Sequence, residues 1–292
     1  MQTINDILTE YCKKLDYLDL ELIIAHVVKK PREFVIAHPE HKIPKFKIEN
    51  LKLKISRRQR GEPLAYILDH KEFFGLDFKV NRHTLIPRPE TELLIELVTR
   101  NLQPITRNEK TAIIDIGTGS GNIIISVIKN LEKLRFQVSG FRFQATDISQ
   151  EALKIAKYNA KIHGVDKKIK FLRGNLLEPI LEYIIPDTKY IILANLPYLS
   201  KEIYNATAPN VKKYEPRSAL YSSKAGLDHY EKLLKQLEEL TKNYKLKTTN
   251  YLEISPEQKP KITKLIKSYF PKAKIDFYKD LANKWRVCKI QI

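Results

Sequence analysis

Apolar residues recur at helical spacing through the first part of the chain. Ile4, Ile7 and Leu8 lie three or four residues apart, as the buried positions of an amphipathic helix do. Two further stretches with this spacing follow, and the first of them stops just before Pro31, where a helix is expected to end. The pattern therefore predicts a small helical domain over residues 1–70.

The hydrophobic period then changes from a helical to an alternating one. Apolar residues at Phe74, Leu76, Phe78 and Val80 alternate with polar or small residues. Such alternation is typical of a strand with one buried face. We expect residues 71–88 to form a β-hairpin that links the helical domain to the rest of the chain.

Short apolar runs alternate with helical patterns over residues 89–292, the third predicted segment. Pro89 suits the first turn of a helix, and Glu90 and Glu92 suit a helix N-terminus by their charge. The alternation predicts an α/β fold, with a mostly parallel, Rossmann-like sheet and helices on both of its faces. The short final connection predicts that the last strand runs antiparallel. We expect seven strands, over residues 111–116, 141–147, 168–175, 189–195, 249–255, 274–280 and 286–292.

The composition adds a strong positive charge to this picture. The 292 residues include 52 Lys and Arg against 34 Asp and Glu, a formal net charge of +18. A polyanionic partner would explain this surplus, but the lysines are spread along the chain without a block of like charge, which favours a solvated lysine-rich surface. The two cysteines lie at opposite ends, so we expect an intracellular protein without a zinc site or redox pair. No apolar run approaches the ~18 residues of a membrane-spanning helix, and the first residues do not resemble a secretory signal.

A glycine-rich turn, DIGTGSG at residues 115–121, stands between a predicted strand and a predicted helix. Glycines let the backbone approach a ligand closely, and the helix behind them offers free N–H groups. The spacing differs from the G-x-G-x-x-G of dinucleotide-binding folds, because the third glycine comes one residue early. The candidate ligand-binding residues of this turn are Gly117, Thr118, Gly119, Ser120 and Gly121.

Polar residues stand at the ends of the next strands. Asp147 follows the second strand, where a carboxylate can accept hydrogen bonds from both hydroxyls of a ribose; the alternative is that it caps the helix near Ser149. The carboxyl ends of central strands face the ligand crevice in an open α/β sheet. We expect Gly117–Gly121, Asp147, Asn175 and Asn195 to line one crevice that binds a nucleoside-bearing cofactor.

This set of residues resembles the class I S-adenosylmethionine-dependent methyltransferases. Within that class, NLPY at residues 195–198 is similar to the Asn/Asp-Pro-Pro-Tyr/Phe motif of enzymes that methylate planar amide or amine nitrogens. Such a nitrogen is a poor nucleophile because its lone pair is delocalised. The side-chain oxygen of Asn195 and the backbone carbonyl of Leu196 can accept its N–H bonds and aim the lone pair at the methyl carbon, while Tyr198 can pack against the flat group. This displacement requires no metal, and we expect none.

Longer motifs narrow the resemblance to one family. The stretches EPLAYILDHKEFFGLDFKV, LIPRPETELLIE, DIGTGSGNI, TDISQEALKIAKYNA, EPRSAL with GLDHYEKLL, LEISPEQ and KDLANKWRV are similar, in this order, to the release-factor glutamine methyltransferase (PrmC/HemK) family. The resemblance implies methyl transfer from S-adenosylmethionine to the glutamine amide in the Gly-Gly-Gln motif of class 1 peptide-chain release factors, in translation termination. It also implies that the helical domain, residues 1–70, helps to hold the release factor.

The resemblance assigns roles by position. Cofactor contacts would come from Gly117, Thr118, Gly119, Ser120, Gly121, Asp147, Asn175, Leu176 and Asn195. The substrate glutamine would contact Asn195, Leu196, Pro197 and Tyr198, with Asn195, Pro197 and Tyr198 catalytic. Some residues depart from the family pattern: Leu196 replaces a proline of the motif, Asn175 replaces an Asp, and Leu176 stands where some relatives have an aromatic residue. In addition, LEISP replaces a more glycine-rich form, and DLANKW departs from the usual Ala-Gly-Arg-Asp ending.

Other functions also fit parts of the pattern. NLPY and the positive charge suit an adenine-N6 methyltransferase acting on DNA or RNA, although residues 1–70 show no zinc finger, helix-turn-helix or RNA-binding signature. A non-catalytic RNA- or ribosome-binding protein on the same fold is a third interpretation, and the intact glycine turn argues against it. We expect a cytoplasmic monomer, bacterial rather than mitochondrial, whose partner is a release factor rather than a membrane or a specific nucleic acid.

Some motif residues have a purely structural alternative. Glu215 and Arg217 could form a local ion pair that contributes ~0–1 kcal/mol. Tyr198 could belong to the hydrophobic core, and Pro87–Pro89 could be a rigid linker.

Overall fold

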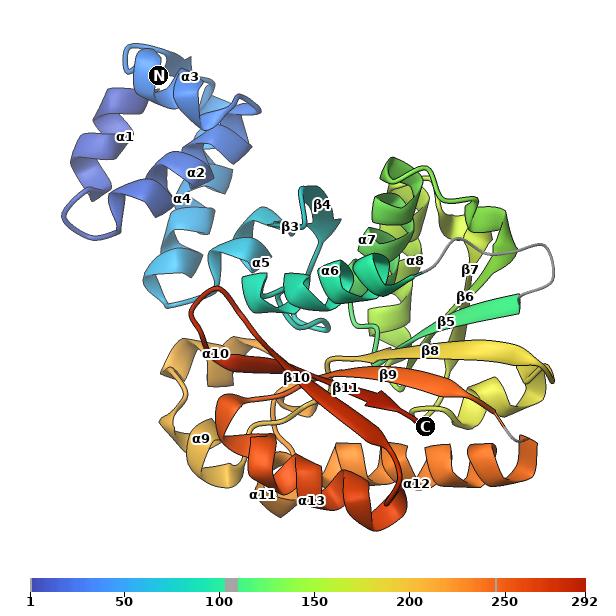
Figure 1. Ribbon diagram of the computed structural model, residues 1–292. Coiled ribbons are helices and arrows are strands. Elements are labelled where there is room, and N and C mark those ends of the chain that lie inside the picture. Colours follow the sequence, from blue (N-terminus) through green and yellow to red (C-terminus); the bar gives the residue numbers. More distant parts are fainter. Residues whose placement is uncertain (1, 103–109, 245) are drawn as a thin grey trace. The chain divides into compact units, whose positions relative to one another are not determined.

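The computed structural model describes residues 2–102, 110–244 and 246–292. The chain divides into two compact units, whose helices and strands are drawn in Figure 1. The first unit comprises residues 1–70 and 208–214, and the second comprises residues 71–207 and 215–292. Along the described residues, no helix combines the length and the apolar character that crossing a membrane requires.

Helices make up most of the first unit. α1 (Ile4–Tyr11) starts at a capping box, in which the side chains of Thr3 and Asp6 each accept a hydrogen bond from the other's backbone N–H. α2 (Tyr17–Val28) ends at Lys29, which has a left-handed φ of 61°. The helices predicted from apolar spacing are thus present. The other elements are α3 (Arg32–Ala37), α4 (Lys45–Gln59), α5 (Leu64–Leu68), α10 (Pro209–Tyr214) and the paired strands β1 (Gln2–Thr3) and β2 (Lys42–Ile43).

A seven-stranded sheet forms the centre of the second unit, in the order β10-β11-β9-β8-β5-β6-β7. The parallel strands are β5 (Lys110–Ile116), β6 (Phe141–Asp147), β7 (Ile169–Arg173), β8 (Thr188–Ala194) and β9 (Thr248–Glu253). The final strand, β11 (Trp285–Gln291), is antiparallel to both of its neighbours, β9 and β10 (Lys274–Lys279). The predicted α/β fold with an antiparallel last strand is confirmed.

The segment before the sheet contains a hairpin, as the alternating pattern predicts. β3 (His70–Phe73) and β4 (Leu76–Lys79) pair across a turn in which Phe74 and Gly75 both have positive φ, of 53° and 69°. A 3₁₀ turn, Pro89–Thr91, then leads into α6 (Glu92–Asn101), so Pro89 occupies the start of a helical segment.

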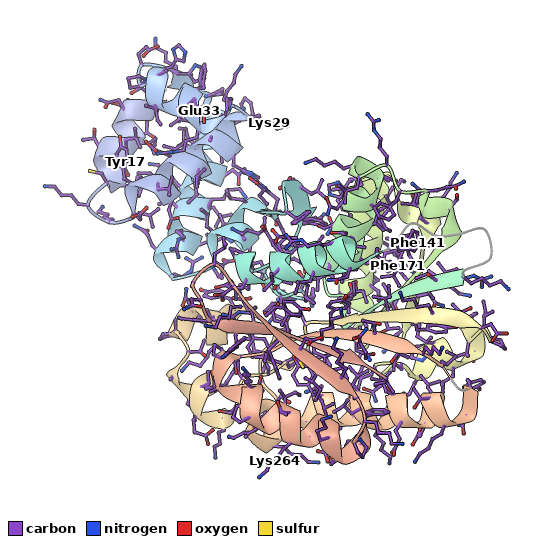
Figure 2. The ribbon with its side chains drawn as sticks, viewed as in Figure 1. Tyr17, Lys29, Glu33, Phe141, Phe171 and Lys264 are labelled. Atoms are coloured by element: carbon purple, nitrogen blue, oxygen red, sulfur yellow. The ribbon has the colours of Figure 1, made fainter. Side chains whose placement is uncertain are left out.

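Helices cover both faces of the sheet (Figure 1). α6, α7 (Asn122–Lys133) and α8 (Gln150–Ile162) share a core with one face, and α12 (Asp228–Tyr244) and α13 (Lys259–Tyr269) share a core with the other. Successive strand residues alternate between these cores: Ile191 lies in the first and Ile192 in the second. Figure 2 shows the side chains that fill these layers, and the exposed Lys264 on the outer side of α13.

The connection between β8 and α12 contains short elements that hydrophobic periodicity does not predict. α9 (Lys201–Ala206) has six residues, and α11 (Ser223–Gly226) has four. Two of those four, Lys224 and Ala225, have positive φ, so α11 is closer to a turn than to a regular helix. Segments this short are well below the window of about 11–18 residues over which hydrophobic periodicity is read.

Candidate functional site

A cavity of about 270 Å³ is lined by the loops that follow β5, β6, β7 and β8, together with residues from 82–91 and 216–229. The carboxyl ends of parallel strands meet at this edge of the sheet, which explains why loops distant in sequence share one cavity. The sequence-predicted residues that line it are Gly117, Thr118, Gly119, Ser120, Asp147, Asn175, Leu176, Asn195, Leu196 and Pro197. Two other predicted residues, Gly121 and Tyr198, do not line it.

The glycine turn connects β5 to α7 through a backbone that only glycine adopts readily. Gly117, Gly119 and Gly121 have φ of 68°, 55° and 81°. A Cβ on Gly121 would lie 3.0 Å from Ile125 Cδ1 and 3.2 Å from Ala156 Cβ, so this glycine allows close helix packing rather than ligand approach. Gly117 and Gly119 are the glycines that face the cavity.

The Asp147 carboxylate is tied to the backbone of two loops. Its Oδ2 accepts from the Gly119 N–H at 2.8 Å, and its Oδ1 accepts from the Ser149 N–H at 2.8 Å. Burial raises the pKa of Asp147, and these two hydrogen bonds oppose the rise. The helix cap is Ser149, whose side chain accepts from the Ala152 N–H, so the alternative in which Asp147 caps this helix is wrong.

Asp115 is a buried acid beneath the glycine turn that the sequence reasoning did not select. Its Oδ2 accepts from the Thr118 hydroxyl at 2.6 Å, and its Oδ1 has no hydrogen-bond partner. Burial raises the pKa of Asp115 to about 7. Its position at the start of the DIGTGSG motif was the available signal.

Asn175 and Leu176 follow β7, and both line the cavity. The Asn175 side chain donates to Glu178 Oε1 at 2.9 Å. Leu176 has a positive φ of 54°, and its side chain is buried in the core shared with α12. Gln236 on α12 accepts from the Leu177 N–H at 2.8 Å, which ties this loop to the helix.

The turn after β8 presents the Asn195 side chain at the cavity. The Asn195 Nδ2 donates to the Thr91 hydroxyl oxygen at 3.1 Å, across 104 residues of sequence. This hydrogen bond occupies the donor end of the carboxamide. Thr91 also lines the cavity, and the sequence reasoning missed it.

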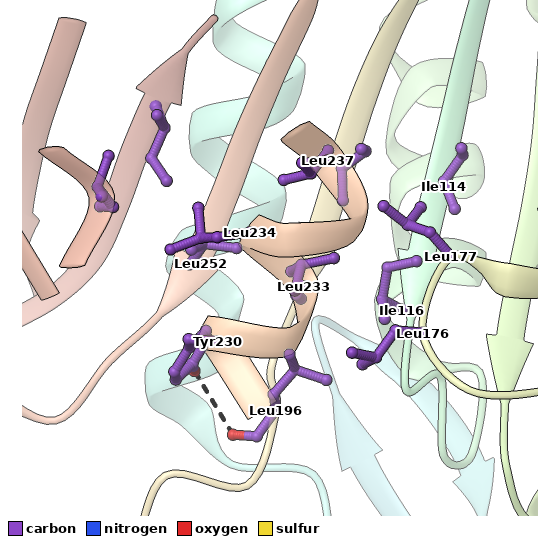
Figure 3. Close-up of a cluster of buried hydrophobic side chains, with 14 of the residues drawn as sticks. Ile114, Ile116, Leu176, Leu177, Leu196, Tyr230, Leu233, Leu234, Leu237 and Leu252 are labelled. Atoms are coloured by element: carbon purple, nitrogen blue, oxygen red, sulfur yellow. Dashed lines mark hydrogen bonds between the residues drawn. The ribbon is translucent and has the colours of Figure 1, made fainter. Parts of the chain in front are cut away.

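Leu196 is largely a core residue, although it lines the cavity. Its side chain is 3% exposed and packs with Ile116, Leu176 and Tyr230, as Figure 3 shows. A Cβ on Gly117 would lie 3.3 Å from Leu196 Cδ2, so the leucine also contacts the glycine turn closely. The Tyr230 hydroxyl lies 3.5 Å from the Leu196 carbonyl oxygen.

Tyr198 turns away from the cavity toward the core. Its hydroxyl donates to Glu253 Oε1 at 3.3 Å, and its ring packs against the cluster shared with α12. Burial raises the pKa of the Tyr198 hydroxyl, and the nearby Glu253 adds to this rise. The structure therefore brings Asn195, Leu196 and Pro197 to the cavity and Tyr198 behind it.

The backbone of the same turn is fixed by two residues from the motifs near α12 and α13. The Gln258 side chain donates to the Tyr198 carbonyl at 3.3 Å and to the Gly226 carbonyl at 2.9 Å. A Cβ on Gly226 would overlap the Tyr198 carbonyl oxygen, so only glycine leaves room for the turn. These contacts give a structural reason for Gly226 in GLDHYEKLL and Gln258 in LEISPEQ.

Glu253 ends β9 directly behind the turn and is 1% exposed. Burial raises its pKa to about 7, while a hydrogen bond with Thr91, the charge of Arg286 and the hydrogen bond from Tyr198 act in the opposite direction. Its Oε2 has no well-formed hydrogen bond. The Tyr230 hydroxyl donates to the backbone carbonyl of Glu253.

An ion pair between the partly exposed Arg88 and the buried Glu215 holds one rim of the cavity. Arg88 Nη2 lies 2.5 Å from Glu215 Oε1, and Glu215 Oε2 accepts from the Ile86 N–H at 3.2 Å. The expected local pair of Glu215 and Arg217 is wrong, because the Arg217 guanidinium instead stacks on Tyr221, 4.9 Å from the ring centre. Pro87 and Arg88 line the cavity, so they are more than a linker.

Comparisons with known proteins agree with this architecture. A family model described as the PrmC N-terminal domain matches residues 4–68, and one described as N-6 DNA Methylase matches residues 84–243. The Release factor glutamine methyltransferase of Dictyoglomus turgidum is 34% identical over 98% of this chain and 95% of its own length. Those of Bacillus anthracis and Coxiella burnetii are 31% and 38% identical, over 93% and 73% of this chain and 91% and 71% of their own lengths.

Solved structures are similar to this chain in fold. The hMettl16 catalytic domain in complex with MAT2A 3′UTR hairpin 1 has a TM-score of 0.54 at 16% identity, and covers 84% of this chain and 79% of its own. The METTL16 MTase domain gives a TM-score of 0.51 at 17% identity, covering 82% of this chain and 80% of its own. At such identities the likeness concerns the fold, whereas the full-length relatives decide the family. This chain is a methyltransferase and belongs to the release factor glutamine methyltransferase family.

Proposed function

We propose that this protein transfers a methyl group from S-adenosylmethionine to the side-chain amide nitrogen of the glutamine in the Gly-Gly-Gln motif of peptide-chain release factors. The observation that carries the proposal is Asn195, a carboxamide held at the cavity wall by its donor end. The names of relatives that match over nearly the whole chain support the choice of substrate.

The cavity suits the adenosyl part of such a cofactor. Gly117 and Gly119 leave the backbone open, and the N-terminus of α7 follows them. Each Asp147 oxygen accepts one backbone N–H and retains a lone pair for a ribose hydroxyl. When bound, S-adenosylmethionine would supply an electrophilic methyl group on a sulfonium.

The substrate side would be formed by the turn after β8. Because Asn195 Nδ2 is engaged by Thr91, its Oδ1 remains available to accept a hydrogen bond from a substrate amide N–H. The Leu196 carbonyl would accept the second N–H, so that the nitrogen lone pair points along the axis of displacement. Positioning of this kind supplies much of the rate in a one-step transfer. The nitrogen lone pair would form the N–C bond as the S–C bond breaks, which would leave the sulfur as a neutral thioether, and the amide proton would pass to solvent.

We propose that the first unit helps to hold the release factor. It exposes several large apolar side chains, which a protein partner would cover: Tyr17, Leu18, Ile36, Phe46 and Leu53. We also propose that the protein acts as a monomer in the bacterial cytoplasm, where release factors work on ribosomes.

Adenine methylation is the main competing function, and it is not favoured. The N-6 DNA Methylase model covers residues 84–243, which contain the shared Asn195 motif. Relatives that match over the first unit as well, such as those of Dictyoglomus turgidum and Bacillus anthracis, carry release factor names. A non-catalytic role fits less well, because the chain keeps a cavity of about 270 Å³ with Asp147 and Asn195 on its walls.

The test is methyl transfer from labelled S-adenosylmethionine to three substrates: a class 1 release factor, the same factor with its loop glutamine changed to alanine, and nucleic acid. We expect label only in the unaltered release factor. Label in nucleic acid and none in the release factor would contradict the proposal.

A further inference from the structure

Glu253 is a buried acid that the proposed reaction does not by itself require. It is 1% exposed, and one of its oxygens lacks a well-formed hydrogen bond. Enclosing a carboxylate is costly unless its partners compensate. Its side-chain partners come from the turn after β8 and from the 3₁₀ turn before α6, both of which border the cavity.

The first link runs from Glu253 through Thr91 to Asn195. Thr91 is a hydrogen-bond partner of the Glu253 side chain. Above pH 7, where Glu253 is ionised, the carboxylate can only accept, so this hydrogen bond uses the one proton of the Thr91 hydroxyl. The Thr91 oxygen can then only accept from its other neighbour. That neighbour is the Asn195 carboxamide, which presents Nδ2 at 3.1 Å.

The second link runs from Glu253 to the other end of the turn. Tyr198 donates its hydroxyl to Glu253 Oε1 at 3.3 Å. The Glu253 side chain thus interacts with Tyr198 at one end of the turn and with Thr91, the hydrogen-bond partner of Asn195, at the other. In addition, the Tyr230 hydroxyl donates to the Glu253 backbone carbonyl and lies 3.5 Å from the Leu196 carbonyl oxygen.

We infer that Glu253 is a positioning residue that fixes the orientation of the Asn195 carboxamide, so that Oδ1 rather than Nδ2 faces the nitrogen to be methylated. The inference rests on the proposed function for the identity of that nitrogen. It also predicts what an isosteric change would do. A glutamine at position 253 could donate to the Thr91 oxygen, and the Thr91 proton would then favour Asn195 Oδ1, which reverses the carboxamide.

The principal experiment compares Glu253→Gln with Glu257→Gln, which removes an exposed carboxylate from the same LEISPEQ stretch. We expect Glu253→Gln to lower kcat for release-factor methylation by about tenfold or more, since small misplacements of reacting groups are this costly. Affinity for S-adenosylmethionine, measured by calorimetry, should change by less than about threefold because the adenosyl side is untouched. Glu257→Gln should match the wild type in both measurements.

Substitutions of Thr91 test the inference while the Glu253 carboxylate stays in place. Thr91→Val removes the hydroxyl with little change of shape and should lower kcat as Glu253→Gln does, whereas Thr91→Ser should restore most of it. This pair tests the inference even if Glu253→Gln fails to fold. Equal activity of the Val and Ser variants would overturn it.

A spectroscopic measurement separates this inference from the proposed function. The Asn195 side-chain NH₂ signal, assigned by its loss in Asn195→Ala, should shift in Glu253→Gln and stay in place in Glu257→Gln. An unmoved signal, or wild-type kcat in Glu253→Gln, would overturn the role of Glu253. Failure of the wild type to methylate a release factor would instead contradict the proposed function, and the NMR comparison would still decide the orientation of Asn195.

Discussion

Two carboxylates end strands of the same sheet, but their partners differ in kind. Asp147, at the end of β6, is half-buried, faces the cavity and accepts hydrogen bonds from two backbone N–H groups. Glu253, at the end of β9, is enclosed and interacts with side-chain hydroxyls. A carboxylate held by backbone groups of adjacent loops keeps its place while it binds a ligand. A carboxylate held by side chains can instead orient those side chains.

The comparison divides the cavity into two functional walls. The glycine wall comprises residues 117–121 and Asp147, and its glycines hold unusual backbone conformations. The asparagine wall comprises Thr91 and residues 195–197, which line the cavity, and the groups behind them, Tyr198 and Glu253. We expect the first wall to govern cofactor affinity and the second to govern the rate of transfer.

The largest expected effect separates the two walls. Asn195→Ala should lower kcat by about 100-fold or more, as removal of a preorganised group at a reacting atom does. Its affinity for S-adenosylmethionine should fall much less. Asp147→Ala should weaken that affinity by about 10–100-fold, because hydrogen bonds to a charged group contribute ~1.5–3 kcal/mol. Steady-state kinetics and calorimetry on both variants check this, and a loss confined to affinity in Asn195→Ala would refute the division.

A second variant pair tests how tightly the asparagine wall is packed. Gly226→Ala should lower the free energy of unfolding by about 2–4 kcal/mol, because overpacking against a fixed backbone adds to the strain of a positive φ. Gly164 has a similar φ of 68° but has nothing within 4 Å of an added Cβ. Gly164→Ala should therefore cost only about 1–2 kcal/mol, which is the backbone strain alone. Urea unfolding measures both, and equal losses would show that the turn moves aside freely.

The pKa of the enclosed Glu253 differs from that of an exposed glutamate. The pKa of Glu253 is raised from 4.5 to about 7 in the folded protein. Between those values the folded state binds more protons than the unfolded state, so the contribution of Glu253 to stability is largest below pH 4.5 and falls as pH rises to about 7. A glutamine at this position does not titrate, so the unfolding free energy of Glu253→Gln should fall by about 1–3 kcal/mol less than that of the wild type over this pH range. Urea unfolding of both proteins at a series of pH values checks it, and parallel pH profiles would contradict it.

The smallest expected effect concerns the far end of the asparagine wall. Tyr198→Phe removes the hydroxyl that donates to Glu253 at 3.3 Å and leaves the ring in the core. We expect a loss of about 0.5–1.5 kcal/mol in stability. The turnover should fall only a few-fold, since the link from Glu253 through Thr91 remains. A loss as large as that of Asn195→Ala would mean that Tyr198 contacts the substrate directly.

The local and periodic features of this protein were predictable because they depend on neighbouring residues. The alternation of strands and helices, the glycine turn and the strand-end positions of Asp147 and Asn195 follow from the hydrophobic pattern and the topology of parallel sheets. The same patterns predict nothing for segments such as α9 and α11, whose six and four residues are far fewer than the window of about 11–18 over which a helical period is read.

Only the tertiary structure decides how the asparagine wall is held. Thr91 and Asn195 are 104 residues apart, Tyr198 and Glu253 are 55 apart, and Arg88 and Glu215 are 127 apart. The sequence offers nearer partners, such as Arg217 beside Glu215, and a local pattern favours them. Which partner is chosen depends on burial and on the direction of each side chain, and both are fixed only when the strands and helices pack together.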